Sequence, residues 1–492
     1  MVFYDTKEIL STKVAYNLLF TSMEFLCLFL PLTLALYYIL PHHLRNVWLL
    51  GMSLLFYAWG EPVFLLAMLF SIVFNYCIAL RIDELKKQKA PKKLLLALAV
   101  VVNLGILFVY KYMNFITATL HSAFPATVNL FPKTNFSLPI GISFFTFQAL
   151  SYVIDVYRGI PAQRKITHIG LYISLFPQLI AGPIVRYTTV MEQLDNRQTT
   201  PADFSKGMLR FLRGFNKKML LANITAQVAD LAFDGSTLSV GMAWLGAICY
   251  ALQIFFDFSG YSDMAIGLGK MIGFDFLENF NYPYISKTIT EFWRRWHISL
   301  GTWFRDYVYF PWGGSRVKSK FKLVFNLSVV WLATGIWHGA NWTFIAWGVL
   351  YGILIIIEKL LDLPKRLPKH KYSEIPYQIF TLLMVLLGWV LFRAPSMDAA
   401  WNYLKSMFGL NGNALLCDRV VLNLPEYAVI IVAGLVCSTP VFKRMKEKLQ
   451  KKNSVLYSAC DIMGYLLQMA LFGVSISFLA MNAHNPFIYF NF

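Results

Sequence analysis

The sequence predicts an all-α polytopic membrane protein of about eleven membrane-crossing or re-entrant helices, with amphipathic helices at the interface. Of its 492 residues, 57% are hydrophobic and only 14% are charged, whereas roughly 25% are charged in a soluble protein. Apolar runs of about 20 residues recur along the chain, which is the length that crosses a hydrocarbon core of about 30 Å. The short alternating segments of a closed β-barrel are not seen.

The basic residues lie in short clusters between the apolar runs. The formal net charge is +18, yet this arrangement is typical of cytoplasmic loops and of contact with anionic lipid head groups. We therefore expect anionic lipids as a partner, and we expect no binding of nucleic acid. The six cysteines are scattered and form no C-x-x-C pair, so neither a disulfide framework nor a metal site is indicated.

Two parts of the chain differ in character. Residues 1–17 are polar enough for an N-terminal extension or an interfacial helix, and 18–492 are predicted to form one transmembrane domain. Four apolar runs begin that domain as predicted spans: Met23–Leu40, Val63–Leu80, Leu94–Tyr110 and Phe136–Val156. Two others are short or interrupted by proline and glycine, which favours re-entrant segments: Val47–Trp59 and Ile166–Val185.

A basic amphipathic segment occupies 204–233. Its cations recur at spacings near three and four, opposite an apolar face: Lys206, Arg210, Arg213, Lys217 and Lys218. The pattern favours a helix in the membrane interface, or a solvent-exposed helix packed on its neighbours. One span is predicted next, Val240–Phe258, and Ser259–Asp263 is predicted to turn the chain into Met264–Phe274.

The stretch Glu291–Leu300 is dense in aromatic and basic residues. One helix is predicted there, with four side chains along one face: Trp293, Trp296, His297 and Leu300. Four cations on or near this stretch form a basic cytoplasmic rim: Arg294, Arg295, Arg305 and Lys318. Such a rim suits the phosphates of coenzyme A or an acidic carrier protein, and lipid head groups are the simpler ligand.

His338 lies between two apolar segments that contain no acid or base, Leu323–Trp337 and Trp342–Ile357. The two segments are predicted to form an antiparallel hairpin, which places His338 in a turn deep in the membrane. Ionisable groups at that depth are functional hypotheses by default, and a histidine suits general-base work on a hydroxyl. The alternative is a packed histidine with a structural role.

Three more spans complete the predicted topology. They are Ile379–Phe392, Tyr427–Val436 and Ser458–Leu479. The tail Asn482–Phe492 contains no Lys or Arg and is therefore predicted to face outward.

Several motifs together carry a family resemblance. Trp337-His-Gly-Ala-Asn-Trp342 resembles the histidine motif of the membrane-bound O-acyltransferases, in the branch of alginate and peptidoglycan O-acetylation proteins. Other stretches match that branch in the same order: Leu138–Gln148 continuing to Ile154–Arg158, Phe176–Pro183, Phe256–Asp263, Glu291–Gly314 and Pro486–Phe492. The resemblance covers nearly the whole chain from about Leu18.

This resemblance implies helices around a central funnel in the plasma (inner) membrane of a bacterium. It implies His338 as the base and His297 as a second histidine that binds the donor or assists transfer, and a purely structural role for His297 stays open. The acyl group, expected to be acetyl, would come from a cytoplasmic donor such as acetyl-CoA or an acyl carrier protein, with no bound cofactor. An exported partner resembling an SGNH hydrolase would then deliver the acyl group to a surface polysaccharide.

Further candidates for donor or substrate binding lie in the same motifs. They are Asn341, Trp337, Arg294, Arg295, Trp296, Arg305, Asp257, Tyr261, Asp263 and Gln178. Carboxylates near the middle of a membrane need partners, so Asp257 and Asp263, with Tyr261, either line a cavity or hold helices in register.

Three other functions stay open on the sequence. A D-alanyl transferase acting on teichoic acid would share the histidine motif. A polysaccharide or lipid transporter would also use broken segments and buried polar groups, although no paired halves are seen. A scaffold for the exported partner would not need His338.

Overall fold

The computed structural model describes residues 18–125, 127, 132, 134–235, 238–366, 371–452, 454–481, 485 and 488. The predicted segment 1–17 and most of the tail 482–492 lie outside these residues. The described part is all-α, as predicted, and has no strand. The chain divides into two compact units, the first of 1–208 with 264–277 and the second of 209–263 with 278–492.

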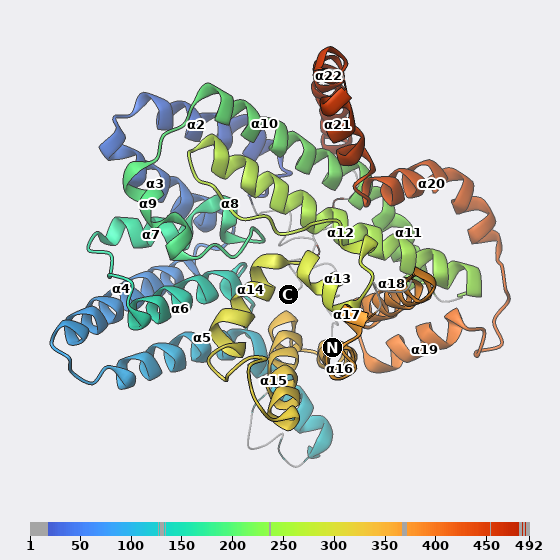
Figure 1. Cartoon of the computed structure of the whole chain (residues 1–492), viewed down its shortest axis with the longest axis horizontal. Helices are drawn as coiled ribbons and strands as arrows, with labels where there is room; N and C mark the ends of the chain where they lie inside the picture. The colour runs from blue at the N-terminus through green and yellow to red at the C-terminus, as the bar shows by residue number, and fades with distance from the viewer. Residues whose placement is uncertain are drawn as a thin grey trace. The chain divides into compact units, whose positions relative to one another are not determined.

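The first unit contains the helices of the N-terminal half (Figure 1). They are η1 (Phe25–Phe29), α2 (Leu30–Ile39), α3 (His42–Gly60), α4 (Leu65–Lys87), α5 (Lys93–Ala123), α6 (Ile142–Arg158), α7 (Ile166–Ser174), α8 (Phe176–Leu179) and α9 (Tyr187–Asn196). The break between α7 and α8 confirms the interrupted segment that the prolines predicted. Helices α10 (Pro201–Asn216) and α12 (Val240–Met271) each contribute residues to both units.

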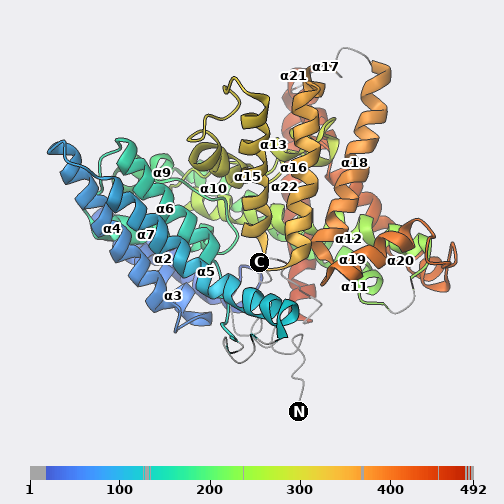
Figure 2. The ribbon, with the colours of Figure 1, turned by 90° about the horizontal axis from the view of Figure 1, so that it is seen from below.

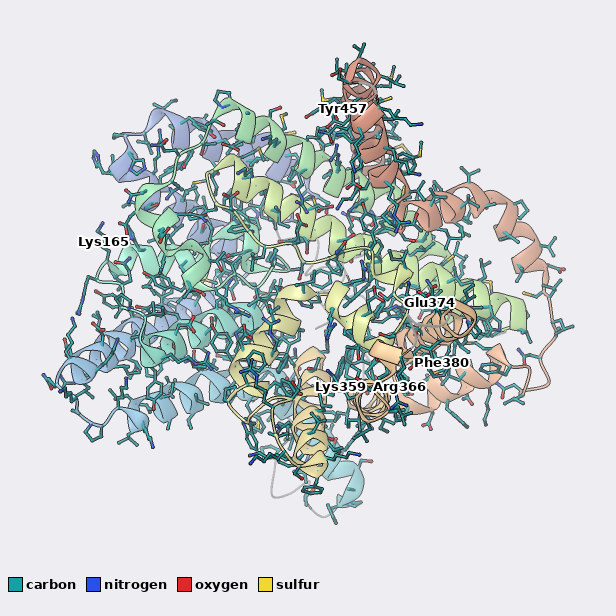
Figure 3. All side chains as sticks on the ribbon, in the orientation of Figure 1. Lys165, Lys359, Arg366, Glu374, Phe380 and Tyr457 are labelled. Atoms are coloured by element: carbon teal, nitrogen blue, oxygen red, sulfur yellow. The ribbon has the colours of Figure 1, made fainter. Side chains whose placement is uncertain are left out.

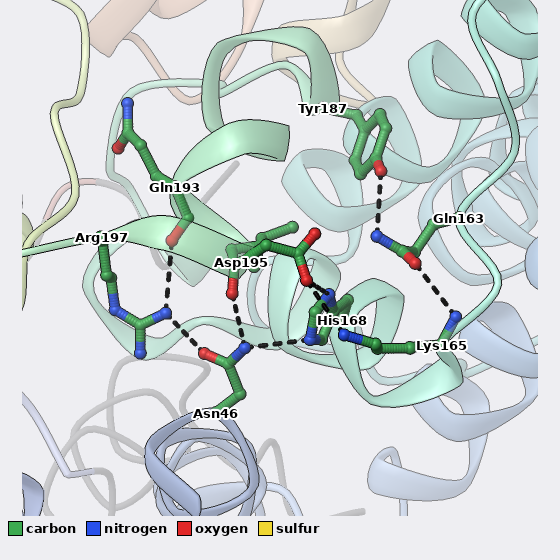
Figure 4. A network of polar contacts seen from close by, with 9 residues as sticks. Asn46, Gln163, Lys165, His168, Tyr187, Gln193, Asp195 and Arg197 are labelled. Atoms are coloured by element: carbon green, nitrogen blue, oxygen red, sulfur yellow. Dashed lines mark hydrogen bonds and ion pairs between the residues drawn. The ribbon is translucent and has the colours of Figure 1, made fainter. Parts of the chain in front are cut away.

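A buried arginine braces this first unit. Nε of Arg197 donates to the Tyr37 hydroxyl at 3.1 Å and to the Ile272 carbonyl at 3.1 Å. Figure 4 shows the surrounding network, in which Nδ2 of Asn46 lies 3.0 Å from Nε2 of His168. Because its guanidinium faces these groups, Arg197 holds α2, α3 and the end of α12 together rather than facing solvent.

The second unit contains the remaining helices and both histidines singled out above. They are η3 (Lys217–Ala222), α11 (Asn223–Phe233), η4 (Pro283–Ile285), α13 (Ile289–Arg295), α14 (Ile298–Phe304), η5 (Arg305–Tyr309), α15 (Lys320–His338), α16 (Trp342–Leu360), α17 (Leu363–Arg366), α18 (Lys371–Arg393), α19 (Met397–Met407), α20 (Asp418–Cys437), α21 (Val441–Lys452) and α22 (Ser454–Ala480). Figure 2 shows α15 and α16 side by side.

Seven helices of the described residues are long and apolar enough to cross a membrane. They are α4, α5, α12, α15, α16, α18 and α22; the pair α20–α21, bent by 56°, would be an eighth. The predicted number of about eleven included re-entrant segments, and several of the predicted segments form helices shorter than a membrane span. For example, α6 has 17 residues and α7 has 9.

The predicted turn at Ser259–Asp263 is wrong, because α12 continues through it as one helix of 32 residues. Its glycine serves close packing instead of a turn. A Cβ added at Gly260 would lie 2.8 Å from the carbonyl oxygen of Gly214. The small residues of this stretch therefore let two helices approach each other.

The segment 204–233 is helical, as predicted, but its polar face is not continuous. The π-helical stretch η3 changes the helical register, and Lys218 is buried instead of lying on the basic face. Its Nζ lies 2.7 Å from Oδ1 of Asp257 on α12. A buried cation needs such a partner, so Lys218 holds two helices together.

Candidate active site

His338 is the last residue of α15, and the hairpin predicted around it is confirmed. The chain turns through Gly339, Ala340 and Asn341 before α16 begins. Asn341 caps α16, since its Oδ1 accepts from the Thr343 amide at 3.2 Å, and its Nδ2 donates to the Pro395 carbonyl at 2.9 Å. The geometry thus gives Asn341 a structural role in fixing the turn after His338.

Glycines set the close approach of the two hairpin helices. A Cβ at Gly335 would lie 2.6 Å from the Phe344 carbonyl oxygen, and a Cβ at Gly348 would lie 2.7 Å from the Trp331 carbonyl oxygen. Since real Cβ atoms do not approach backbone oxygens so closely, neither position accepts a larger residue without a shift of the helices. The position of His338 relative to α16 follows from this contact.

Aromatic rings surround the buried imidazole of His338. Its centroid lies 5.1 Å from Trp337, 4.9 Å from Trp347 on α16 and 5.2 Å from Phe392 on α18. The Trp347 and Phe392 rings are also 5.3 Å apart, so they pack on each other as well as on the histidine. These aromatic rings provide a low-dielectric environment, in which electrostatic interactions are stronger than in water.

His297 lies at a break between two helices, so the predicted single helix over Glu291–Leu300 is wrong. Helix α13 ends at Arg295, Trp296 is extended, and His297 adopts a left-handed conformation with φ 45° and ψ 55°. Asn279 holds the break: its carbonyl accepts from the Ile298 amide at 3.0 Å, and its Oδ1 lies 3.1 Å from Nδ1 of His297. These contacts replace the helical hydrogen bonds that are lost there.

The two histidines are connected through one indole. The Trp337 ring lies 6.1 Å from the ring of His297 and 5.1 Å from that of His338. A second ring beside His297 is that of Phe258, at 4.6 Å in an edge-to-face arrangement. Burial lowers the pKa of His297 to about 3, so this imidazole is neutral at physiological pH. Its Nε2 has no hydrogen-bond partner among the described residues.

Of the four cations in the predicted basic rim, one is bound by groups of its own chain and three are exposed. Arg295 binds Glu291 through Nε at 2.9 Å and Nη2 at 2.8 Å, and it donates to the Asn281 carbonyl. Arg305 pairs with its neighbour Asp306 and is half exposed. Arg294 and Lys318 are exposed. The geometry therefore leaves Arg294, Arg305 and Lys318 accessible to an anionic ligand, whereas Arg295 is committed to its own helix.

Trp296 is buried and belongs to the core rather than to an open surface. Its ring stacks on Phe292 at 5.6 Å and lies 4.7 Å from Trp389 on α18. This packing fixes the residue directly before His297. Trp296 therefore has a packing role next to His297.

An open groove of about 430 Å³ lies beside the start of α15, and it includes neither histidine. It is lined by Pro311, Trp312, Gly313 and Lys322. Asn326 on α15 anchors this loop by donating to the carbonyls of Trp312 and Gly314, each at 3.2 Å. The groove is thereby attached to the helix that ends in His338.

The carboxylates of α12 are internally paired. Asp257 bonds to Lys218 and accepts from the Ile488 amide at 3.1 Å. Asp263 accepts from Arg210 at 2.8 Å and from Lys217 at 2.6 Å. Of the two roles that the sequence left open for these acids, the contacts favour holding helices in register.

The two remaining candidates, Tyr261 and Gln178, are buried side chains. Tyr261 lies on α12, one turn after Asp257. Gln178 belongs to the first unit, where its Nε2 donates to the Tyr172 carbonyl at 2.6 Å.

Sequence reasoning missed two residues that organise this region, Asn279 and Glu358. Asn279 stands 18 positions before the histidine that it binds, and no pattern marks that pairing. Glu358 is a fully buried acid near the end of an apolar helix, which is a usable signal because such acids are rare without a role. The Thr288-x-x-Glu291 sequence also marks the start of α13.

Comparisons with known proteins agree with the motif pattern. The sequence profile of the membrane-bound O-acyltransferase family matches residues 49–397, a range that includes both histidines. A probable alginate O-acetylase of Azotobacter vinelandii is 42% identical over 96% of this chain and 100% of that protein. A peptidoglycan O-acetyltransferase of Helicobacter pylori is 34% identical over 99% of each.

A more distant relative has a different acyl group in its name. A teichoic acid D-alanyltransferase of Streptococcus thermophilus is 27% identical over 51% of this chain and 68% of that protein. The extent of the family match and the identities over nearly full length decide the assignment. The chain is a multi-pass membrane enzyme, an O-acyltransferase, and belongs to the membrane-bound O-acyltransferase family.

Proposed function

We propose that this enzyme moves an acetyl group from a cytoplasmic donor across the membrane for O-acetylation of a cell-surface polysaccharide. His338 is the general base. The observation that carries the proposal is its place at the turn of a glycine-packed hairpin, enclosed by aromatic rings. The names of the two relatives with nearly full-length matches support acetyl as the acyl group.

In the proposed step, His338 takes the proton of an acceptor hydroxyl as its oxygen attacks the carbonyl carbon of a thioester donor. The carbon–sulfur bond breaks, the acetyl group passes to the oxygen, and the leaving sulfur receives the proton from the imidazolium. In this step the neutral imidazole is the proton acceptor, which is the usual role of a histidine general base. The donor is acetyl-CoA or an acyl carrier protein.

His297 has a supporting role in this proposal. With Nδ1 directed at Asn279, its Nε2 is left as a neutral acceptor close to Trp337. A group of this kind accepts a hydrogen bond from a donor or acceptor molecule and orients it. It does not deliver a proton, because the imidazole is neutral at physiological pH.

The exposed cations and the topology complete the proposal. Arg294, Arg305 and Lys318 attract the phosphates of the donor or anionic lipids at the cytoplasmic face. The protein resides in a bacterial plasma membrane with its C-terminus outside. An exported partner resembling an SGNH hydrolase passes the acetyl group to the polymer.

Deletion of the gene tests this function. Ester-linked groups are released from each surface polymer by mild alkali and identified, with wild-type and His338→Ala proteins restored separately at matched levels. The proposal predicts that acetate disappears from one polymer and returns only with the wild-type protein. Loss of D-alanine instead would favour teichoic acid as acceptor, and an altered polymer or lipid distribution with unchanged esters would favour transport.

A further inference from the structure

Glu358 is a fully buried carboxylate that the proposed reaction does not use. It lies on α16 near the end opposite the His338 turn, 16 residues after Trp342. At about 1.5 Å per residue this separates it from the turn by roughly 24 Å along the helix. Burying a carboxylate is costly unless it is fully hydrogen-bonded, so its partners indicate its role.

Those partners are the first backbone amides of α13. Oε1 of Glu358 accepts from the Ile289 amide at 2.7 Å, and Oε2 accepts from the Thr290 amide at 2.8 Å. The Tyr377 hydroxyl of α18 donates to Oε1 at 3.0 Å. Both oxygens are therefore occupied by short hydrogen bonds to a charged acceptor, which are about twice as strong as neutral ones.

Together with Thr288, the carboxylate accepts hydrogen bonds from the first three amides within α13. The first amides of a helix have no partner within it. Here the third, that of Glu291, donates to the Thr288 hydroxyl at 3.1 Å, while Glu358 takes the first two. The orientation of α13 is thus fixed from outside the helix, by a side chain of the catalytic hairpin.

The other end of α13 leads directly to His297. Between the two ends, the Trp293 ring packs at 5.2 Å against Trp347, which itself contacts the His338 ring at 4.9 Å. A displacement of the first turn of α13 would therefore move both the Trp293 indole and the helix break that holds His297. No other described side chain replaces the two hydrogen bonds of Glu358.

We infer that Glu358 is a positioning residue, which anchors α13 to the His338 hairpin and so holds His297 in place for acyl transfer. This inference rests on the proposed function for its catalytic consequence only. The anchoring of α13 by Glu358 does not depend on the proposed function and is measured separately.

The chain offers a matched set of variants. Glu358→Gln keeps the volume but has only one acceptor oxygen, so one α13 amide loses its partner. The control is Glu374→Gln, at a residue of α18 that Figure 3 labels. Its carboxylate pairs with the side chain of Lys287, two residues before Ile289. The control leaves the amides of α13 bonded. All variants are full-length proteins reconstituted in lipid.

The anchoring is tested by the chemical accessibility of His297. Diethyl pyrocarbonate modification of buried His297 is measured by peptide mass spectrometry relative to exposed His43 in the same sample. We expect Glu358→Gln to raise the relative rate at His297 and Glu374→Gln to leave it at the wild-type value. Equal rates in all three proteins would overturn the inference.

The catalytic consequence is read with acetyl-CoA as the probe donor and a soluble oligosaccharide with free hydroxyl groups as the probe acceptor, by release of free coenzyme A. Glu358→Gln should lower kcat about 100-fold, as expected for a small misplacement, with KM nearly unchanged. Faster modification of His297 with an unchanged kcat would also overturn the inference. If wild-type protein releases no coenzyme A, acetyl-CoA is not the donor and an acyl carrier protein is the remaining proposal, and the modification rates still decide whether Glu358 anchors His297.

Discussion

Nδ1 of His297 lies 3.1 Å from Oδ1 of Asn279, and the same oxygen accepts from the Ser299 hydroxyl at 2.9 Å. One amide oxygen thus holds the helix break and sets the histidine tautomer. Asn279→Ala leaves buried donors without an acceptor, so we expect a loss of about 1–3 kcal/mol in unfolding free energy and reduced acyl transfer. Thermal unfolding of the purified protein and acetyl-ester release from cells measure the two effects.

The control for that variant is Asn281→Ala, two residues away at an exposed position. It should unfold and transfer like the wild-type protein. Equal stability of the Asn279→Ala and Asn281→Ala proteins would show that the bond to His297 does not brace the break.

Stability should also depend on pH through His297. Its pKa is about 3 in the folded protein, against about 6.5 when unfolded, so only the unfolded chain binds this proton in mild acid. The contribution of neutral His297 to the free energy of unfolding is therefore complete above about pH 6.5. It is lost as pH falls, by about 1.4 kcal/mol per pH unit. Wild-type protein should lose more Tm between pH 7 and pH 5 than His297→Asn, which cannot titrate. Parallel Tm curves would contradict the burial of a neutral imidazole.

The buried ion pair of Lys218 and Asp257 should be structural and strongly coupled. Lys218→Met leaves a buried carboxylate uncompensated and should cost about 3–5 kcal/mol. Adding Asp257→Asn removes that charge while keeping an acceptor for the Ile488 amide, so the double variant should recover much of the loss. Unfolding of the two single variants and the double variant gives the coupling energy. Additive losses would argue that the pair does not hold the helices.

Replacing a hairpin glycine with alanine should lower stability, although helix propensity alone would predict an increase. Alanine is normally favoured over glycine in a helix by up to about 1 kcal/mol. At Gly335 the added Cβ meets a backbone oxygen at 2.6 Å, so Gly335→Ala should instead cost about 1–3 kcal/mol and displace His338. Gly105→Ala on α5, where the added Cβ meets no atom within 4 Å, is the matched control. Transfer activity per folded molecule should fall only in the first variant.

Hydropathy and family motifs predicted the helical class, the family and the hairpin of α15 and α16. The hairpin was predictable because two uncharged runs flank a Gly-Ala-Asn turn, and no tertiary contact competes with that pattern. The single helix over Glu291–Leu300 failed because the break at His297 depends on Asn279, which is distant in sequence. Periodicity carries no information on such a contact.

Polar residues inside helices were the other source of error. Ser259–Asp263 has the composition of a turn, yet Gly260 packs against Gly214 within a continuous α12. Lys218 has the spacing of a surface cation, yet the π-helical register of η3 turns it toward Asp257. In both cases tertiary packing overrides the local pattern, and a single sequence does not reveal the partner.

We propose that His338 carries acyl transfer across the membrane. Inverted plasma-membrane vesicles from the native cell, supplied outside with acetyl-CoA labelled in its acetyl group, test it most directly by the alkali-labile label recovered from the lumen. We predict that label accumulates with wild-type protein and with the exposed-residue control His43→Ala, and that His338→Ala abolishes it at equal protein levels. Accumulation at the wild-type rate in the His338→Ala vesicles would contradict the account.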